Sequence, residues 1–193
     1  MEGDDAGTLD TPVDGDADFD RDTSLQIHEA VESLQQVETI EPSVWASLDA
    51  DARLEVLQNV EERMAAIQGR PTVEVTSMPM GQNTFGGYDG ARISLNADHL
   101  ASDMPVEEFV NTIVHEGRHA YQDYAVHHPG FVTNQAVVDS WAENMVPGNY
   151  LTAEEYGQAL YASQPIEADA WAYADRITRG LSARGAQGQA SWT

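Results

Sequence analysis

The spacing of apolar residues predicts two helices in the first third of the chain. Apolar positions recur at helical intervals over residues 24–40, where Pro42 interrupts the pattern, and again over residues 49–68. The second helix is expected to stop at Gly69-Arg70-Pro71. Its predicted buried stripe consists of Leu54, Leu57, Val60, Met64 and Ile67.

The pattern changes after residue 72 to the short alternation that is typical of strands. We expect strands over residues 73–78 and 91–96, antiparallel to each other, with the glycine-rich stretch 81–90 as a turn or loop between them. An exposed edge on the second strand could bind an extended peptide by strand addition. An ordinary hairpin explains the same pattern equally well.

Helical spacing returns in the second half of the chain. Pro105, with two glutamates in the turn that follows it, marks the start of a helix that runs to residue 124 or 127. Further helical stretches are predicted over residues 134–145, 150–163 and 165–179. The fold class is therefore expected to be α+β and mostly helical, with a small antiparallel sheet before the helix that starts near Pro105.

That helix contains the sequence His115-Glu116-Gly117-Arg118-His119. The two histidines lie one helical turn apart, so both imidazoles can reach one metal ion. Apolar residues of the segment occupy the opposite arc, which lets the helix pack while the histidines face a cleft. Glu116 lies about 100° round the helix from His115, a position suited to holding a metal-bound water. A zinc-bound water has a pKa near 7, and a neighbouring carboxylate can take its proton during attack on a carbonyl. A chance occurrence of the motif is the alternative.

A catalytic zinc site needs a third protein ligand, and the absence of cysteine restricts the choice to His, Asp or Glu. Glu167 and Asp169 are the candidates in the last predicted helix. Glu167 lies about 60° from the centre of the apolar side of that helix, and Asp169 lies about 100° away. We therefore expect Glu167 as the ligand, with Asp169 as the alternative or as a group that orients a ligand imidazole.

Two motifs resemble zincin-like metallopeptidases whose third ligand is a glutamate on a downstream helix. The motifs are His115-Glu116-x-x-His119-Ala120-Tyr121-Gln122 and Tyr161-x-x-Gln164-Pro165-x-Glu167-x-Asp169-Ala170-x-x-Tyr173-Ala174. Similar domains occur in bacterial effector and polymorphic-toxin proteins, and the resemblance covers about residues 72–179. In well-characterised members an aspartate commonly follows the third ligand by four residues, where this chain has Trp171.

The resemblance implies a zincin-like fold and a peptidase that uses one zinc ion on a protein or peptide substrate. His115, His119 and Glu167 would bind the metal, and Glu116 would act as general base and then protonate the leaving amine. Tyr161, His127 and His128 are candidates for stabilising the oxyanion of the tetrahedral intermediate.

Two other functions are compatible with the sequence. In the first, the chain is an effector or regulator that uses a metal-containing zincin fold as a non-hydrolytic binding module. In the second, the zinc is purely structural, and a fourth protein ligand such as His127 or Asp169 closes its coordination shell.

Charge narrows the possible partners. The chain has 33 acidic and nine basic residues and a formal net charge of −24, which argues against binding nucleic acid or anionic membranes. Residues 1–22 are acidic and poor in apolar side chains, so we expect a disordered tail before a single domain over residues 23–193. No apolar run approaches the length of a membrane span, and no signal peptide is recognisable. A cytoplasmic location, or export by a non-classical route, is expected.

Overall fold

The structure is a computed structural model that describes residues 21–189, with side chains described over residues 22–183. Most of the described chain is helical, and three short strands form one mixed sheet, which confirms the predicted α+β class. Nearly all of the expected acidic tail lies outside the described residues. The last two of its 22 residues already belong to the first helix.

The long helices follow one another as predicted, and several short ones are added. The single helix predicted over residues 150–163 is wrong, because Gly157 separates two short helices there, and the last helix continues past its predicted end at residue 179. In chain order the elements are α1 (Arg21–Leu34), the 3-10 helix η1 (Glu38–Ile40), α2 (Pro42–Trp45), α3 (Ala50–Gln68), β1 (Glu74–Met78), β2 (Gly86–Tyr88), β3 (Arg92–Asn96), α4 (Ala97–Leu100), α5 (Val106–His127), α6 (Gln135–Met145), α7 (Ala153–Tyr156), α8 (Gln158–Ala162) and α9 (Pro165–Gln189).

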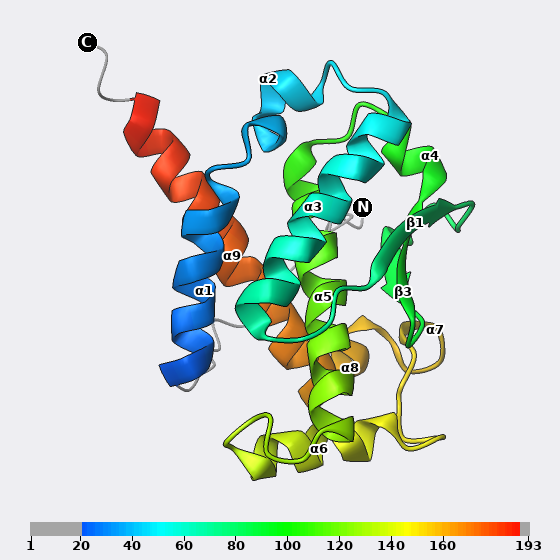
Figure 1. Ribbon diagram of the computed structural model, residues 1–193. Coiled ribbons are helices and arrows are strands. Elements are labelled where there is room, and N and C mark those ends of the chain that lie inside the picture. The colour runs from blue at the N-terminus through cyan, green and yellow to red at the C-terminus, as the bar shows by residue number, and fades with distance from the viewer. Residues whose placement is uncertain (1–20, 190–193) are drawn as a thin grey trace, which may run out of the picture.

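Helix α5 runs through the middle of the molecule (Figure 1). Helices α3 and α9 make the most extensive helical packing against it, α1 packs on both α3 and α9, and α6 crosses near the C-terminal end of α5. The sheet lies beside α5, and its strand β2 contacts that helix. Residues from four separate parts of the chain therefore surround the central helix.

The second predicted helix is α3, and its ends carry the expected signals. Asp49 accepts a hydrogen bond from the backbone N–H of Ala52 at 2.9 Å, which caps the first turn. Gly69 ends the helix with φ of 70°, a left-handed conformation that favours glycine. The first predicted helix is shorter than expected, because α1 ends at Leu34 and Pro42 begins the short helix α2.

The predicted antiparallel pairing of the first and last strands is wrong. The strand order is β1-β3-β2, in which β1 pairs with β3 in parallel and β2 pairs with β3 antiparallel. The chain passes from β1 to the far side of β3, where it forms β2, and then turns back into β3. The hairpin is therefore formed by β2 and β3. The glycine-rich stretch is therefore partly strand rather than only a turn.

Glycine at position 86 lets β2 lie against α5. A Cβ atom there would lie 2.9 Å from the backbone oxygen of Ser94 and 2.9 Å from Cγ2 of Thr112 on α5. The strand immediately before the helical pair α4 and α5 is β3, which has partners on both sides and offers no free edge. The exposed edge that the sequence suggested for that strand is therefore wrong, and the edge strands of the sheet are β1 and β2.

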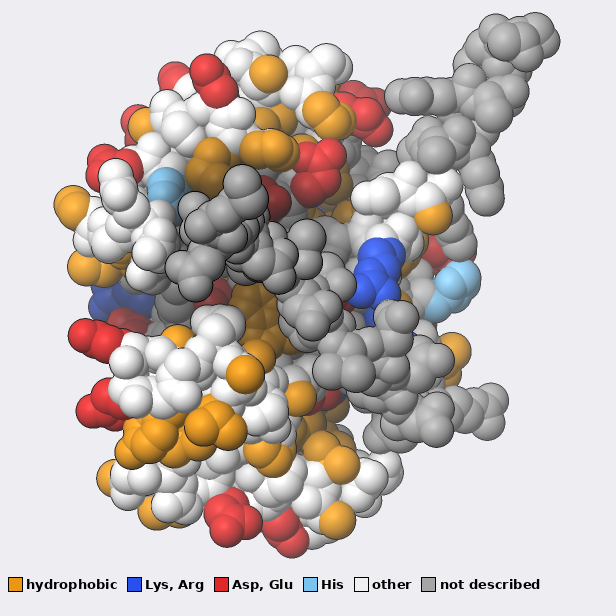
Figure 2. Space-filling model, turned by 180° about the vertical axis from the view of Figure 1, so that it is seen from behind, with side chains coloured by type: hydrophobic (Ala, Val, Ile, Leu, Met, Phe, Trp, Pro, Cys, Tyr) orange, Lys and Arg blue, Asp and Glu red, His pale blue; other side chains and the backbone are white. Residues whose placement is uncertain are grey.

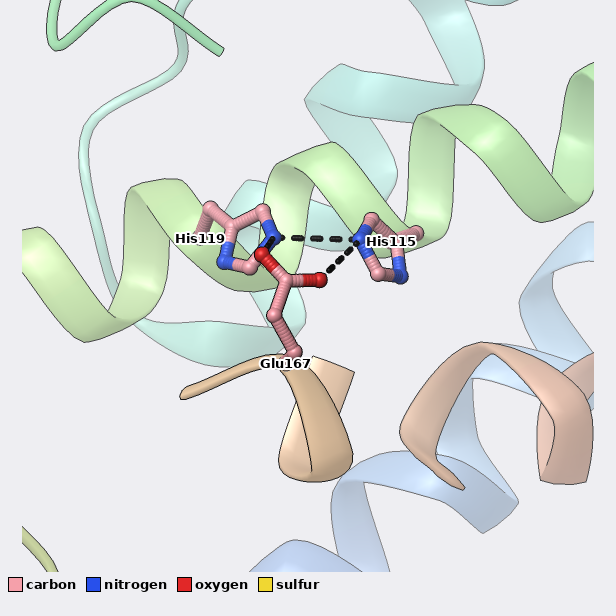
Figure 3. A group of neighbouring side chains, drawn as sticks. All are labelled: His115, His119 and Glu167. Carbon is pink, nitrogen blue, oxygen red and sulfur yellow. Dashed lines mark hydrogen bonds and ion pairs between the residues drawn. The ribbon is translucent and has the colours of Figure 1, made fainter. Parts of the chain in front are cut away.

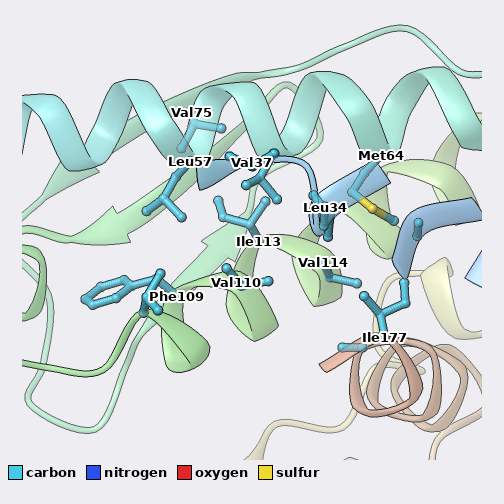
Figure 4. Close-up of a cluster of buried hydrophobic side chains, with 14 of the residues drawn as sticks. Leu34, Val37, Leu57, Met64, Val75, Phe109, Val110, Ile113, Val114 and Ile177 are labelled. Carbon is cyan, nitrogen blue, oxygen red and sulfur yellow. The ribbon is translucent and has the colours of Figure 1, made fainter. Parts of the chain in front are cut away.

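The main hydrophobic core lies between α5 and the elements around it (Figure 4). Phe109, Val110, Ile113 and Val114 of α5 are buried in it, which confirms the predicted apolar arc of this helix. Other core residues come from α1, α3, β1 and α9, among them Leu34, Leu57, Met64, Val75 and Ile177. A second, smaller core joins α5, α6 and the start of α9. Among the described residues, no helix combines the length and apolar character that crossing a bilayer requires.

Candidate metal centre

His115, His119 and Glu167 converge at one point between α5 and α9 (Figure 3). The Nε2 atoms of the two histidines are 3.0 Å apart. Oε2 of Glu167 lies 3.4 Å from Nε2 of His115, and Oε1 lies 3.4 Å from Nε2 of His119. Within the described residues this is the group of His, Asp and Glu side chains whose ligand atoms could hold a metal ion.

The start of α9 places Glu167 in this position. Ile166 and Ala170 are buried on the apolar side of the helix, as the sequence predicted. Ala170 and Ala174 are fully buried and small, which allows close packing of α9 on α5. Glu167 points to the histidines with 0% of its surface exposed, whereas Asp169 does not join them. Glu167 is therefore the carboxylate that reaches the histidine pair, as its predicted angle on the helix indicated.

The three side chains fit a zinc ion in chemistry and in spacing. Two imidazole nitrogens bound to one tetrahedral zinc at about 2.0–2.1 Å lie about 3.3 Å from each other. The observed separation of the Nε2 atoms is 3.0 Å. Two buried polar atoms of the group, Nδ1 of His115 and Oε2 of Glu167, have no hydrogen-bond partner. Imidazole and carboxylate ligands without thiolates suit Zn²⁺ and other first-row divalent metals.

The electrostatics of the group favour a positive charge. Burial opposes ionisation of Glu167, but its close contacts with His115 and His119 outweigh burial and hold the pKa of Glu167 far below its usual range. Burial likewise opposes protonation of His119, but its contact with Glu167 and the charge of Glu116 raise its pKa overall. The same negative groups that retain a proton here would also attract a metal cation.

Glu116 lies beside this group without joining it. Its side chain is half-buried, and its charge acts on both His119 and Tyr161. Within the described residues its carboxylate has no hydrogen-bond or ion-pair partner, so it is available to a water molecule. Its position beside the histidine pair agrees with the helical geometry, and its role as a general base stays a prediction.

Asp169 is linked to His119 through Gln122, a residue for which the sequence predicted no role. Nδ1 of His119 is 2.8 Å from Oε1 of Gln122, and Nε2 of Gln122 donates to Oδ2 of Asp169 at 2.7 Å. Asp169 also forms a two-point ion pair with Arg118. The spacing of three residues between His119 and Gln122 was the available signal, because side chains at i and i+3 meet on a helix.

Two tyrosines lie next to the carboxylate of Glu167. Tyr150 donates a hydrogen bond to Oε1 of Glu167 at 2.6 Å, and the ring of the predicted Tyr161 packs edge-on against Tyr150 at 6.1 Å. Burial and the neighbouring carboxylate raise the pKa of both phenols, so both remain proton donors at neutral pH. The sequence carried no signal for Tyr150, because it lies in the irregular segment between α6 and α7.

The other two predicted candidates, His127 and His128, do not reach the metal centre. His127 has 68% of its side chain exposed and bonds through Nδ1 to the backbone oxygen of Asp123. His128 bonds to the backbone oxygen of Tyr124 and stacks on that ring at 3.8 Å. Neither histidine closes the coordination of the three-residue group.

A cleft of about 760 Å³ lies next to the metal centre, and His119 and Glu167 line it. Tyr88, Asp123 and Tyr150 also line the cleft. Part of its wall comes from α6 and the segment that follows it, including residues 144–148. Two of the three ligand groups therefore border a space that is large enough for a bound molecule.

Comparison of this chain with protein-family models, with curated proteins and with solved structures gives no match. The site itself must therefore carry the functional argument.

Proposed function

We propose that this protein is a zinc-dependent peptidase whose metal is held by His115, His119 and Glu167. The observation that carries the proposal is the convergence of three ligand groups, two of which line an open cleft, with the free carboxylate of Glu116 beside them. Three protein ligands and one open position are typical of a catalytic zinc, whereas a structural zinc has four protein ligands. The positions of His127 and Asp169 argue against a fourth protein ligand.

The residues of the chain divide the chemistry between them. Zinc, when bound, would lower the pKa of a coordinated water and polarise the substrate carbonyl. Glu116 takes the proton of the attacking water and delivers it to the leaving amine. The Tyr150 hydroxyl donates to a ligand oxygen at 2.6 Å and retains its proton, so we propose that it turns this hydrogen bond to the oxyanion as negative charge develops there. The proposal gives Tyr150 the role for which the sequence suggested Tyr161, His127 or His128.

The free edge of β2 is the expected binding site for the substrate backbone. Gly86 and Tyr88 of β2 lie opposite Leu95 and Ile93 of β3. The hydrogen bonds between the strands are made at the neighbouring positions, from the N–H of Asp89 to the oxygen of Arg92 and from the N–H of Asn96 to the oxygen of Phe85. In such an antiparallel ladder, the backbone groups of Gly86 and Tyr88 point to the free edge. Because Tyr88 also lines the cleft, a peptide paired with β2 would run toward the metal centre.

The charge of the surface is compatible with a protein or peptide substrate rather than nucleic acid. On the face in Figure 2, acidic side chains are spread over the surface and basic side chains are few. The net charge of −24 would repel a phosphate backbone.

Metal content and cleavage of a broad peptide library by the purified chain test the proposal. Wild type is expected to carry one zinc per chain, and Glu116→Gln is expected to keep the zinc while losing about 10²–10⁴-fold of its activity. Glu108→Gln, an exposed glutamate on the same helix, is the matched control and should match wild type. A wild-type chain that binds no stoichiometric metal contradicts the proposal. Stoichiometric metal without cleavage of any peptide favours the alternative, a metal-containing binding module.

A further inference from the structure

The two histidines of the metal centre differ in what supports them from behind. Nδ1 of His119 bonds to Oε1 of Gln122 at 2.8 Å, and Nε2 of Gln122 in turn bonds to Oδ2 of Asp169 and to the backbone oxygen of Ile166, at 2.7 and 2.9 Å. Nδ1 of His115 is buried and has no hydrogen-bond partner. Of the two histidines, His119 is therefore held by a hydrogen bond at its second ring nitrogen, and His115 is not.

The chain of hydrogen bonds behind His119 has a single possible direction. The carbonyl oxygen of Ile166 and the ionised carboxylate of Asp169 only accept hydrogen bonds, so the NH₂ group of Gln122 must face them and its oxygen must face His119. A flipped amide would place its oxygen against two acceptors. Nδ1 of His119 must then carry a hydrogen, which leaves Nε2 unprotonated and able to bind a metal.

Arg118 anchors this chain of bonds at its far end. Its Nε and Nη2 donate to the two carboxylate oxygens of Asp169 at 2.8 and 3.0 Å. The guanidinium is buried, with its central carbon 4.4 Å from the ring centre of Tyr121 and 4.5 Å from that of Tyr173. A buried, bidentate and ring-stacked arginine leaves Asp169 no other orientation. Arg118, one of the two variable residues of the motif, thus helps to hold His119 through Asp169 and Gln122.

We propose that Gln122, held by Asp169 and Arg118, is a positioning residue that keeps His119 in the Nδ1–H tautomer before any metal binds. This inference rests on the proposed metal site and adds to it the residue that prepares one of its ligands. It makes the second histidine of the motif the preorganised ligand of the pair.

Nitrogen-15 NMR of the histidine rings in the full chain tests the tautomers directly. The spectra are recorded at alkaline pH, where both imidazoles are neutral, before and after addition of Zn²⁺, and each signal is assigned from His115→Gln and His119→Gln. His119 is expected as the Nδ1–H tautomer in both states. An Nε2–H tautomer of His119 in the metal-free chain overturns the proposal.

Zinc affinity and unfolding stability of three variants separate positioning from a merely structural role. Gln122→Met removes the acceptor and should weaken zinc binding about 10–100-fold. Gln122→Glu retains an acceptor toward His119 and should bind zinc more tightly than Gln122→Met, although its carboxylate faces Asp169 and lowers stability. The control Gln58→Met loses bonds to the backbone of Val73 and Val75, so it should lose stability and keep zinc affinity.

The outcomes distinguish this inference from the proposed function. Zinc affinities that follow stability across the three variants, or wild-type affinity in Gln122→Met, overturn the positioning role. A wild-type chain that binds no zinc contradicts the peptidase, but the tautomer of His119 in that chain still decides whether Gln122 holds the ring as proposed.

Discussion

The indole ring of Trp171 packs against the imidazole ring of His115, with ring centroids 4.3 Å apart and planes inclined by 51°. Trp171 follows Glu167 by four residues, so one face of α9 presents both side chains to α5. His115 therefore has an aromatic neighbour on this side, and its Nδ1 has no hydrogen-bond partner.

Trp171→Ala should loosen the His115 ring and weaken zinc binding by about tenfold. Stability should fall by only about 0.5–1.5 kcal/mol, because 38% of the Trp171 surface is exposed and an aromatic contact contributes in this range. Isothermal titration with Zn²⁺ and chemical denaturation measure the two effects. Tyr156→Ala, an exposed aromatic on α7, should leave zinc affinity unchanged. Wild-type zinc affinity in Trp171→Ala would show that the ring contact does not hold His115.

Tyr150→Phe tests the proposed oxyanion donor. Loss of the hydroxyl that bonds to Glu167 should lower kcat by about 10²–10³-fold, because it removes a transition-state hydrogen bond. KM should change little if the phenol acts mainly in the transition state. Steady-state kinetics with a cleaved peptide give both values, with Tyr156→Phe as control. An unchanged kcat would assign the donor role to another group.

Gly117, within the histidine motif, is predicted to be required for packing α5 against α3. A Cβ atom there would lie 2.9 Å from Nη2 of Arg70 and 3.1 Å from Oε2 of Glu61, which form a buried ion pair. Gly117→Ala should therefore lower the free energy of unfolding by about 1–3 kcal/mol, although alanine favours a helix. Chemical denaturation measures the change. Gly87→Ala, where a Cβ meets nothing within 4 Å, should stay within about 0.5 kcal/mol of wild type.

The ion pair itself should be costly to break from one side. Arg70 bonds to both carboxylate oxygens of Glu61, at 2.7 and 2.8 Å, and both side chains are almost completely buried. Arg70→Met leaves an uncompensated buried charge and should cost about 3–5 kcal/mol of stability. The double variant Glu61→Gln/Arg70→Met removes both charges and should recover part of this loss. A double variant no more stable than the single one would contradict the electrostatic explanation.

Alkaline pH should destabilise the fold through the phenols of Tyr88, which is partly buried, and Tyr173, which is fully buried. Burial, with Asp123 as the next cause, raises the pKa of Tyr88 to about 12, and burial raises that of Tyr173 to about 12. The unfolded chain releases these protons near pH 10, whereas the folded chain retains them, so stability is intact below pH 10. It should fall as the pH rises from about 10 to about 12. Denaturation at several pH values, with tyrosinate absorbance as a second probe, measures this. Tyr88→Phe should reduce both the late absorbance step and the slope.

Several features of the protein followed from the sequence, because they depend on contacts between residues close together in the chain. The apolar arc of α5 and its histidine pair are both set by the helical period of about 3.6 residues. The same period placed Glu167 on the inward side of α9 and set Asp169 further round. Caps such as Asp49 and Gly69 are also local, and the limits of α3 agreed with the prediction within a residue.

Other features depend on where distant segments meet, and only the tertiary structure decided them. The parallel pairing of β1 with β3 depends on the path of the connecting segment rather than on strand pattern. Tyr150 reaches Glu167 from an irregular segment, and the amide of Gln122 is oriented by a carboxylate 47 residues away. Side-chain periodicity repeats within an element and says which face is inward, but it contains no information on which other element that face will meet. That is settled by packing of the whole core, in which the close contact of α9 with α5 builds the metal centre.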